Sequence, residues 1–236
     1  MDQPSRENIW EMFDAISPTY DRTNRILSFG TDLLFRKKLS EYLPEKNQLK
    51  LLDLATGTAD QIIALMDTTD KIDEVTGLDP AQKMLDLGEK KLRDKFYHPK
   101  VRLVCGVSEN LPFEEHAFDV VTISFGIRNV QSVEKTLSEA CRVLKPGGLL
   151  MILEFSLPEK RWINYLYLLY LRRLLPLLGG IASGNFSAYR YLNKTIETFP
   201  YGEAFLEILQ KNGWNHPKRV PLLFGTMQLY LAHSYD

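Results

Sequence analysis

Apolar residues follow two different periods along the chain, and each change of period marks a predicted element. We predict strands at residues 49–54, 74–79, 101–105, 118–124 and 147–155. The run at 118–124 is nearly continuous in apolar residues, which is typical of a central parallel strand that is buried on both faces. Apolar residues at helical spacing separate the strands, at residues 59–68, 81–96 and 131–144. The alternation predicts an α/β fold built on a mostly parallel sheet.

The two ends of the chain follow other patterns. Residues 7–43 are helical in spacing, interrupted at Ser17-Pro18, and a second helix near residues 32–42 follows the turn Ser28-Phe29-Gly30. We expect residues 1–45 to form a helical lid. A helix at 201–212 and two closely joined strands, near 216–221 and 226–233, end the chain. Strands joined this tightly are antiparallel, so we predict a seven-stranded sheet with an antiparallel C-terminal strand and helices on both faces.

Residues 157–200 form an apolar insertion after the fifth strand. Its first apolar run, residues 162–171, is shorter than the roughly 20 residues that span a bilayer, and we expect Arg172, Arg173 and Pro176 to break any extension. Two interpretations stay open. The segment either covers the core as a buried helix, or it forms a flap that receives an apolar substrate or touches a membrane surface through residues 162–178.

Composition narrows the class of protein. The chain has 236 residues, which suits one α/β domain over 1–236, and its net charge of −1 gives no reason to expect nucleic acid as a partner. Cys105 and Cys141 fit no metal spacing, and we expect both in the core. Residues 1–7 lack the apolar core of a secretion signal. We therefore expect a cytoplasmic protein without a metal, with residence at the inner face of the membrane as the alternative.

The segment KLLDLATGTAD, at residues 50–60, carries the first candidate site. It predicts a buried strand that ends in Asp53, a tight turn around Gly57, and the start of a helix. A second strand ends in Asp79 about twenty residues later, at the spacing that lets a carboxylate bind the two hydroxyls of a ribose. The pair indicates a nucleoside-containing cofactor.

The turn also excludes some cofactors. A dinucleotide-binding turn needs three glycines to admit a pyrophosphate, and this turn has only Gly57. A phosphate loop with its Lys and Ser/Thr is missing as well. S-adenosylmethionine fits, because it has no phosphate and its sulfonium and ammonium charges favour nearby carboxylates. The alternative is that Asp53 caps a helix and that Asp79 starts one with Pro80 at its first position.

Three longer segments resemble one family. They are YDRTNRILSFG at residues 20–30, ISFGIRNV at 123–130, and RVLKPGG at 142–148 with its continuation to EFS at 154–156. Together they are similar to the UbiE/MenG quinone-biosynthesis C-methyltransferases, within the Rossmann-like class I S-adenosylmethionine-dependent methyltransferases. The resemblance runs from about Met12 to His233. The chain departs from the family's usual residues at Thr23 (Met), Asp32 (His), Phe35 (Trp), Ala59 (Gly) and Val107-Ser108 (Asn-Ala).

The resemblance implies cofactor contacts and a reaction. It assigns the contacts to Thr58, Asp79, Val107, Ser108 and Ser124, and the argument from the turn adds Asp53 and Gly57. The implied reaction places a methyl group on a ring carbon of a polyprenylated demethylmenaquinol-type quinol, in menaquinone or ubiquinone biosynthesis. The chemistry requires alignment of the reacting atoms, stabilisation of a phenolate and exclusion of water.

Arg128, Asn129 and Tyr20 are the candidate catalytic residues. Arg128 and Asn129 follow the fourth strand, where they could stabilise the phenolate and hydrogen-bond a ring oxygen, and Tyr20 could orient the ring from the lid. The structural alternatives are a salt bridge for Arg128 and a core position for Tyr20. Two other functions stay open: methylation of a soluble oxygen or nitrogen acceptor, and a non-catalytic role in binding or assembly. The sequence leaves dimerisation undecided.

Overall fold

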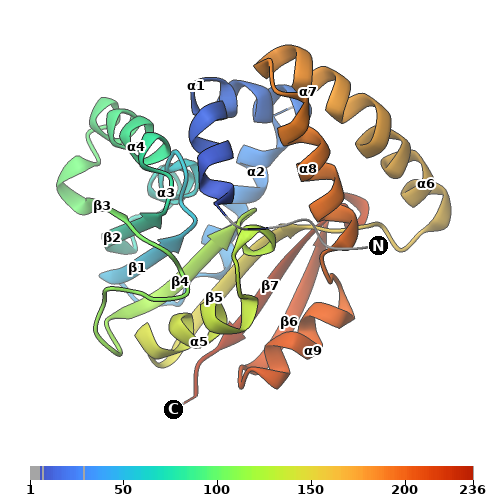
Figure 1. The fold of residues 1–236 in the computed structure, drawn as a ribbon. Coiled ribbons are helices and arrows are strands. Elements are labelled where there is room, and N and C mark those ends of the chain that lie inside the picture. The colour runs from blue at the N-terminus through green and yellow to red at the C-terminus, as the bar shows by residue number, and fades with distance from the viewer. Residues whose placement is uncertain (1–5, 7, 29, 236) are drawn as a thin grey trace.

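Seven strands form one sheet in the order β3-β2-β1-β4-β5-β7-β6 in the computed structural model, which describes residues 6, 8–28 and 30–235 (Figure 1). The strands are β1 (Leu49–Leu54), β2 (Ile72–Asp79), β3 (Val101–Cys105), β4 (Phe118–Ser124), β5 (Leu144–Phe155), β6 (Asn215–Leu222) and β7 (Met227–His233). Neighbours among β1–β5 pair in parallel. β7 pairs antiparallel with β5 and with β6. The predicted fold class is confirmed.

Four helices cover the two faces of the sheet. They are α3 (Asp60–Met66), α4 (Gln82–Asp94), α5 (Val133–Val143) and α9 (Glu203–Lys211). Successive strand residues point to opposite faces, and the core divides accordingly. Leu52 packs with Leu137 of α5 and Phe205 of α9, whereas Leu51 packs with Ile62 of α3 on the other face.

A third group of helices lies beyond the carboxyl ends of the strands. It comprises α1 (Ile9–Ser28), α2 (Thr31–Lys38), α6 (Arg161–Leu169), the π-helical segment η4 (Tyr170–Leu174), α7 (Leu175–Ser183) and α8 (Phe186–Thr198). Figure 1 shows α1 and α2 beside α7 and α8. Their own core joins Ile16 of α1, Leu171 and Leu175 of the insertion, and Met84 of α4. The lid and the insertion thus pack together above the strand ends.

The expected interruption at Ser17-Pro18 does not occur, because α1 continues through Pro18. Proline has no N–H, so the carbonyl of Asp14 lacks its usual backbone donor. The hydroxyl of Ser17 donates to that carbonyl at 2.9 Å instead. The turn at Ser28–Gly30 follows α1, with Gly30 in the left-handed region (φ 74°), but Phe29 lies outside the described residues.

The expected break at Arg172, Arg173 and Pro176 is also wrong. The chain passes from α6 through η4 into α7 without leaving helical geometry, and Pro176 is the second residue of α7. None of the helices in the described part of the chain is long and apolar enough to cross a membrane.

Two smaller expectations need correction at strand ends. β5 begins at Leu144 rather than residue 147, because Leu144 already pairs with Phe118 before an irregularity in the ladder. Cys105 is exposed and not in the core, since β3 is an edge strand of the sheet. Cys141 is partly buried.

Candidate active site

The ends of β1, β2 and β4 converge on one tight turn. Residues 55–59 follow β1, and the backbone N–H of Thr56 donates to the carbonyl of Leu78 at 3.1 Å. The N–H of Gly57 donates to the Asp79 carboxylate at 2.8 Å. Gly57 and Ala59 both have left-handed backbones, with φ of 55° and 62°. A left-handed alanine costs about 1 kcal/mol, which gives a physical reason for the family's glycine at position 59.

Asp53 lies beneath this turn and is not among the residues that line a cavity. It is buried, and it accepts hydrogen bonds from the hydroxyls of Thr56 (2.7 Å) and Thr122 (2.6 Å). Burial raises the pKa of Asp53 to about 6, although the two hydroxyls act in the opposite direction. Its visible role is to hold the turn against β4.

A first cavity, the turn cavity, opens above the turn and has a volume of about 170 Å³. The structure brings six of the seven predicted cofactor residues to its wall: Gly57, Thr58, Asp79, Val107, Ser108 and Ser124. Ser108 is buried and shares a hydrogen bond of 3.0 Å with the Thr136 hydroxyl, whereas Val107 is exposed. Only Asp53 stays away from the wall.

Asp79 is the carboxylate of the turn cavity. It is 8% exposed, and its two oxygens accept the N–H groups of Gly57 and Ala81, at 2.8 and 2.9 Å. Burial raises its pKa to about 6, and these two N–H groups limit the rise. A carboxylate oxygen can accept more than one hydrogen bond, so Asp79 can also accept hydroxyl groups from the cavity.

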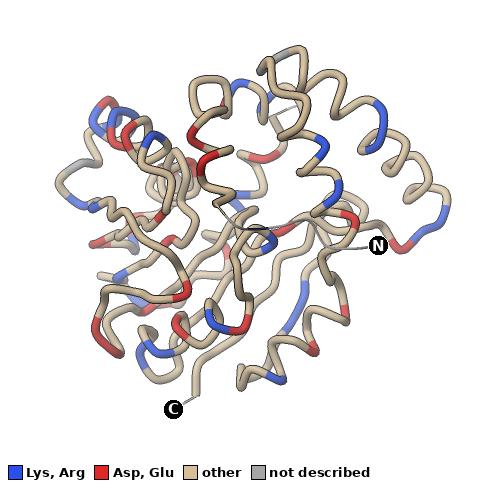
Figure 2. Tube along the Cα trace, in the orientation of Figure 1, with Lys and Arg blue, Asp and Glu red and all other residues tan. Residues whose placement is uncertain are grey.

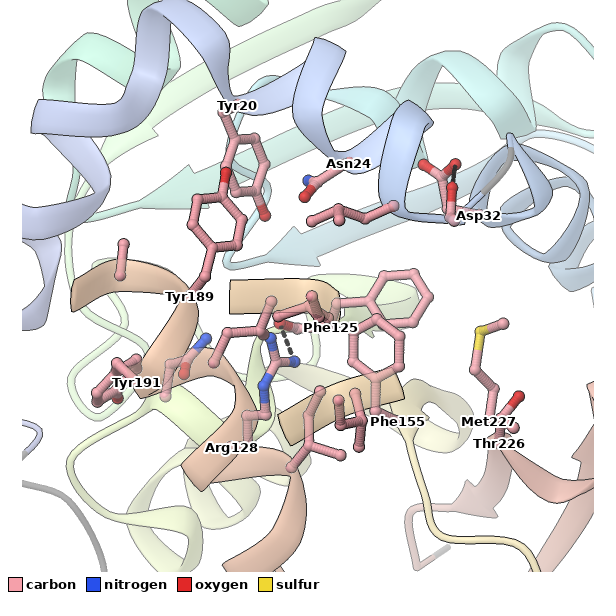
Figure 3. Close-up of a pocket in the computed structure, with 18 of the residues that line it drawn as sticks. Tyr20, Asn24, Asp32, Phe125, Arg128, Phe155, Tyr189, Tyr191, Thr226 and Met227 are labelled. Atoms are coloured by element: carbon pink, nitrogen blue, oxygen red, sulfur yellow. Dashed lines mark hydrogen bonds between the residues drawn. The ribbon is translucent and has the colours of Figure 1, made fainter. Parts of the chain in front are cut away.

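A second, larger cavity of about 270 Å³ adjoins the first, and we call it the apolar cavity (Figure 3). Aromatic and aliphatic side chains from α1, η4, α7 and α8 line most of it. Tyr20 reaches it from α1, and Arg128 lies across from Tyr20. The two cavities share five lining residues: Phe13, Tyr20, Arg36, Phe125 and Asn129. All three predicted catalytic residues therefore line the apolar cavity, and Tyr20 and Asn129 lie at the junction.

The backbone at this junction is constrained. Phe125, directly after β4, has φ 59°, which is rare for a bulky residue, and its N–H donates to the carbonyl of Leu153 at 2.7 Å. A Cβ on Gly126 would lie 2.5 Å from the Cβ of Ala55, so the ends of β1 and β4 can approach only with glycine at this position. Strained residues of this kind cluster at functional sites.

Arg128 forms a buried ion pair. Its Nη1 donates to Glu154 at 2.5 Å and to the carbonyl of Phe125 at 2.7 Å, and its guanidinium lies 5.1 Å from the centre of the Phe155 ring. Both partners are almost fully buried, at 4% and 1% exposure. The salt bridge named as the structural alternative is present, and Arg128 still lines the apolar cavity.

Asn129 and Tyr20 supply the other polar groups. The Oδ1 of Asn129 is buried and has no hydrogen-bond partner among the described residues. Burial raises the pKa of the Tyr20 hydroxyl, while the charges of Arg36 and Arg128 act against this rise. A buried acceptor without a partner indicates that a ligand donor completes it.

Charged residues of the lid also hold the turn. Arg25 of α1 pairs with Asp32 and with Asp60 (2.5 Å), and Lys91 of α4 pairs with Asp60 and with Asp21 (2.8 Å). These charges lower the pKa of Asp60, although burial alone would raise it. The departure Asp32 is thus part of an ion network that ties α1 and α2 to the first residue of α3.

Two residues of this site were missed by reasoning from sequence. Glu154 begins the EFS segment at residues 154–156 but had no predicted role. Arg36 lies in the predicted helix over residues 32–42, and it shares the buried face of that helix with Asp32 and Leu39. The sequence did contain a signal for Arg36, because its helical spacing from Asp32 and Leu39 places a charged residue on the same face of the helix.

Comparisons with known proteins agree with this geometry. Residues 1–233 match the model of the ubiE/COQ5 methyltransferase family. A demethylmenaquinone methyltransferase of Thermus thermophilus is 43% identical over 221 residues, which cover 94% of this chain and 99% of that protein. A ubiquinone/menaquinone biosynthesis C-methyltransferase of Campylobacter jejuni is 40% identical over 237 residues, covering 96% and 97%. An S-adenosylmethionine-dependent methyltransferase structure from Thermotoga maritima has a TM-score of 0.68 at 19% identity, covering 96% and 99%, and shares the fold.

Proposed function

Because the chain belongs to the ubiE/COQ5 methyltransferase family, we propose that it methylates a ring carbon of a polyprenylated demethylmenaquinol-type quinol. The methyl donor is S-adenosylmethionine, and the reaction serves menaquinone or ubiquinone biosynthesis. One observation carries the proposal: the turn cavity, which is lined by Gly57 and Asp79, and the apolar cavity share a wall at Tyr20, Phe125 and Asn129.

The residues of the turn cavity fit the methyl donor. Asp79 offers acceptor positions suited to ribose hydroxyls, and nothing lies within 4 Å of where a Cβ of Gly57 would be, so the turn leaves open space. Thr58, Val107, Ser108 and Ser124 complete the wall. When bound, the donor supplies a methyl group that is already activated by its sulfonium.

The apolar cavity supports a quinol with a hydrocarbon tail. Leu171, Leu175, Ala188 and Ile196 line it from the insertion, whereas the Arg128 guanidinium, the Asn129 amide and the Tyr20 phenol line it from the end of β4 and from α1. A ring with oxygen substituents suits the polar side, and a tail suits the aliphatic walls. A small polar acceptor would leave most of these walls without a partner.

A ring hydroxyl loses its proton to water, which makes the ring carbon nucleophilic. Methyl transfer then forms the carbon–carbon bond and breaks the sulfur–methyl bond. The methylated carbon gives up its hydrogen as a proton and the ring oxygen regains one, so the products are the methylated quinol, S-adenosylhomocysteine and one proton.

Arg128, Asn129 and Tyr20 then have distinct roles. The guanidinium of Arg128 stabilises the phenolate, and it cannot itself serve as base because a guanidinium stays protonated in proteins. Asn129 accepts a hydrogen bond from the second ring hydroxyl through its free Oδ1. Tyr20 holds the ring at the junction of the cavities.

The experiment is transfer of a labelled methyl group from S-adenosylmethionine to a demethylated naphthoquinol under reducing conditions. We expect label on the ring carbon and a turnover that rises with tail length. A quinol whose ring carbon already carries the methyl group is the control acceptor, and it should stay unlabelled. Label on an oxygen of the control would favour the alternative acceptor class, and cofactor binding without turnover on any quinol would favour a binding role.

We also infer that the insertion contacts a lipid surface. Exposed apolar side chains recur along one side of α6 and α7 at Trp162, Tyr165, Leu166, Leu169, Leu177 and Ile181. Between Glu159 and Glu197 the sequence has no acidic residue and has six Lys or Arg residues. Figure 2 shows these basic positions along the insertion. An apolar side flanked by cations suits anionic lipid, where the tail of the quinol resides.

A further inference from the structure

Arg36 is a buried cation on α2. It is 7% exposed, and among the described residues no carboxylate lies within ion-pair distance of it. Its Nε is buried and has no hydrogen-bond partner in the part of the chain that the structure describes. Its guanidinium lies 5.0 Å from the centre of the Phe125 ring. The other buried arginine, Arg128, is by contrast paired with Glu154.

Two buried carboxylates interact with the charge of Arg36, but neither forms an ion pair with it among the described residues. The charge of Arg36 lowers the pKa of Asp60, whose oxygens contact Arg25 and Lys91. It acts in the same direction on the pKa of Asp53, whose two oxygens accept threonine hydroxyls. A buried guanidinium without a directly paired carboxylate suits a bound anion.

The position of Arg36 is fixed by the residues around the turn. Its backbone carbonyl accepts the side-chain amide of Gln61 at 3.1 Å, and the oxygen of the same amide accepts the hydroxyl of Ser124 at 2.8 Å. These two hydrogen bonds through Gln61 connect α2 to the end of β4. Arg36 therefore lines both cavities at a place set by the turn itself.

We propose that Arg36 binds the carboxylate of the methionine portion of the methyl donor. The inference rests on the proposed function and adds a residue to the donor site. Asp79 is the last residue of β2, and Ser108 follows β3. A nucleoside held by these two residues therefore extends its amino-acid portion toward the junction of the cavities, where Arg36 lies. That carboxylate is charged before any reaction occurs, whereas a quinol hydroxyl is neutral at rest. A guanidinium and a carboxylate also match in a two-pronged geometry.

The test compares two ligands by calorimetry on the intact protein. S-adenosylhomocysteine carries the carboxylate, and 5′-methylthioadenosine has the same nucleoside without the amino-acid portion. We expect Arg36→Gln to weaken S-adenosylhomocysteine roughly 10- to 100-fold, the range for a lost hydrogen-bonded charge, and to leave 5′-methylthioadenosine unchanged. Lys37→Gln is the matched control, because Lys37 is an exposed cation on the same helix, and it should change neither affinity.

Several outcomes would overturn the assignment. One is an equal loss for both ligands in Arg36→Gln, and another is no loss for either. A third is that Arg36→Gln leaves the affinity for S-adenosylhomocysteine unchanged and raises the KM for the quinol, which would mean that Arg36 binds an anionic form of the acceptor. If the wild-type protein binds neither ligand, the result contradicts the proposed function itself and not only the assignment of Arg36.

A stability measurement guards against misfolding of the variant. Removing an unpaired buried cation should leave the Tm of the free protein equal to or above that of the wild type. S-adenosylhomocysteine should then raise the Tm of Arg36→Gln less than that of the wild type. Arg36→Lys, which keeps the charge but not the two-pronged geometry, should bind with intermediate affinity. If S-adenosylhomocysteine raises the Tm of Arg36→Gln as much as that of the wild type, the proposed role of Arg36 in binding the carboxylate is contradicted.

Discussion

Arg128 makes a structural contact and, under the proposed function, has a role in the reaction. Its ion pair with Glu154 is almost fully buried, so each partner is needed to neutralise the other. The same guanidinium lines the apolar cavity beside Asn129. Loss of activity in a single variant would therefore not separate catalysis from folding, and a pair of variants is needed.

A double variant separates the two roles. Arg128→Met leaves Glu154 buried without a counter-charge and should lower the free energy of unfolding by about 3–5 kcal/mol. Arg128→Met with Glu154→Gln removes both charges and should regain most of that stability in urea denaturation. Methyl transfer should stay about 10²- to 10³-fold below the wild type in both, because the stabiliser of the phenolate is gone. Recovery of activity together with stability would show that Arg128 acts only through the fold.

At the level of single residues, six of the seven residues predicted to contact a cofactor line the turn cavity. Motif positions placed Gly57, Asp79 and Ser124 at the turn cavity, because strand ends and turn residues are set by local pattern. Sequence reasoning could not place Arg36, whose significance depends on a missing carboxylate partner. It also could not show that the Asp53 side chain lies beneath the turn, since this depends on hydroxyls of residues 56 and 122.

At the scale of elements, α1 is the least predictable from sequence. A proline normally ends or bends a helix, and the pattern predicted an interruption at Ser17-Pro18. The continuous helix depends on one side-chain donor, the Ser17 hydroxyl on the Asp14 carbonyl. The strands were easier, because nearly continuous apolar runs have few alternatives in an α/β chain. The passage from η4 into α7 shows the same limit, because a π-helical segment has no local sequence pattern from which it could be predicted.

A double-mutant cycle tests whether the Ser17 hydroxyl replaces the backbone donor that Pro18 lacks in α1. Ser17→Ala should cost about 1 kcal/mol of unfolding free energy in the wild-type background, because the Asp14 carbonyl then loses its donor. In a Pro18→Ala background the backbone N–H of residue 18 can donate instead, and Ser17→Ala should cost close to nothing. Urea denaturation of the four proteins gives the coupling. Equal costs in both backgrounds would show that the hydroxyl does not replace the missing donor.

At the scale of the whole molecule, exposed apolar side chains gather on the α6–α7 part of the insertion. The mostly parallel sheet and its antiparallel C-terminal pair could be predicted from sequence, because the alternation of elements and the short last connection restrict the topology. The order of the strands was not predicted. The burial of the insertion could not, and the sequence left a buried cover and an exposed flap equally open. The exposed Trp162 (68%) and Ile181 (68%) favour the flap.

Vesicle binding tests this face. Trp162→Ser with Ile181→Ser should weaken binding to phosphatidylglycerol-containing vesicles by about tenfold or more, because burying one large apolar side chain contributes roughly 1.5–3 kcal/mol. Turnover on a short-tailed quinol in solution should stay unchanged. Phe96→Ser is the matched control, since Phe96 is 88% exposed but lies after α4, away from the insertion. An equal effect of the control, or undiminished binding by the double variant, would argue against the membrane face.

The shared wall of the two cavities has a consequence for how such an enzyme can diverge. Phe13 and Tyr20 of α1 border both cavities, so a change there alters the donor site together with the acceptor site. Residues 167–196, in contrast, contribute to the apolar cavity alone. Selection for a new acceptor can therefore act on the insertion while the donor site stays intact. The insertion is therefore a part of the structure where the apolar cavity can change while the wall of the turn cavity stays the same.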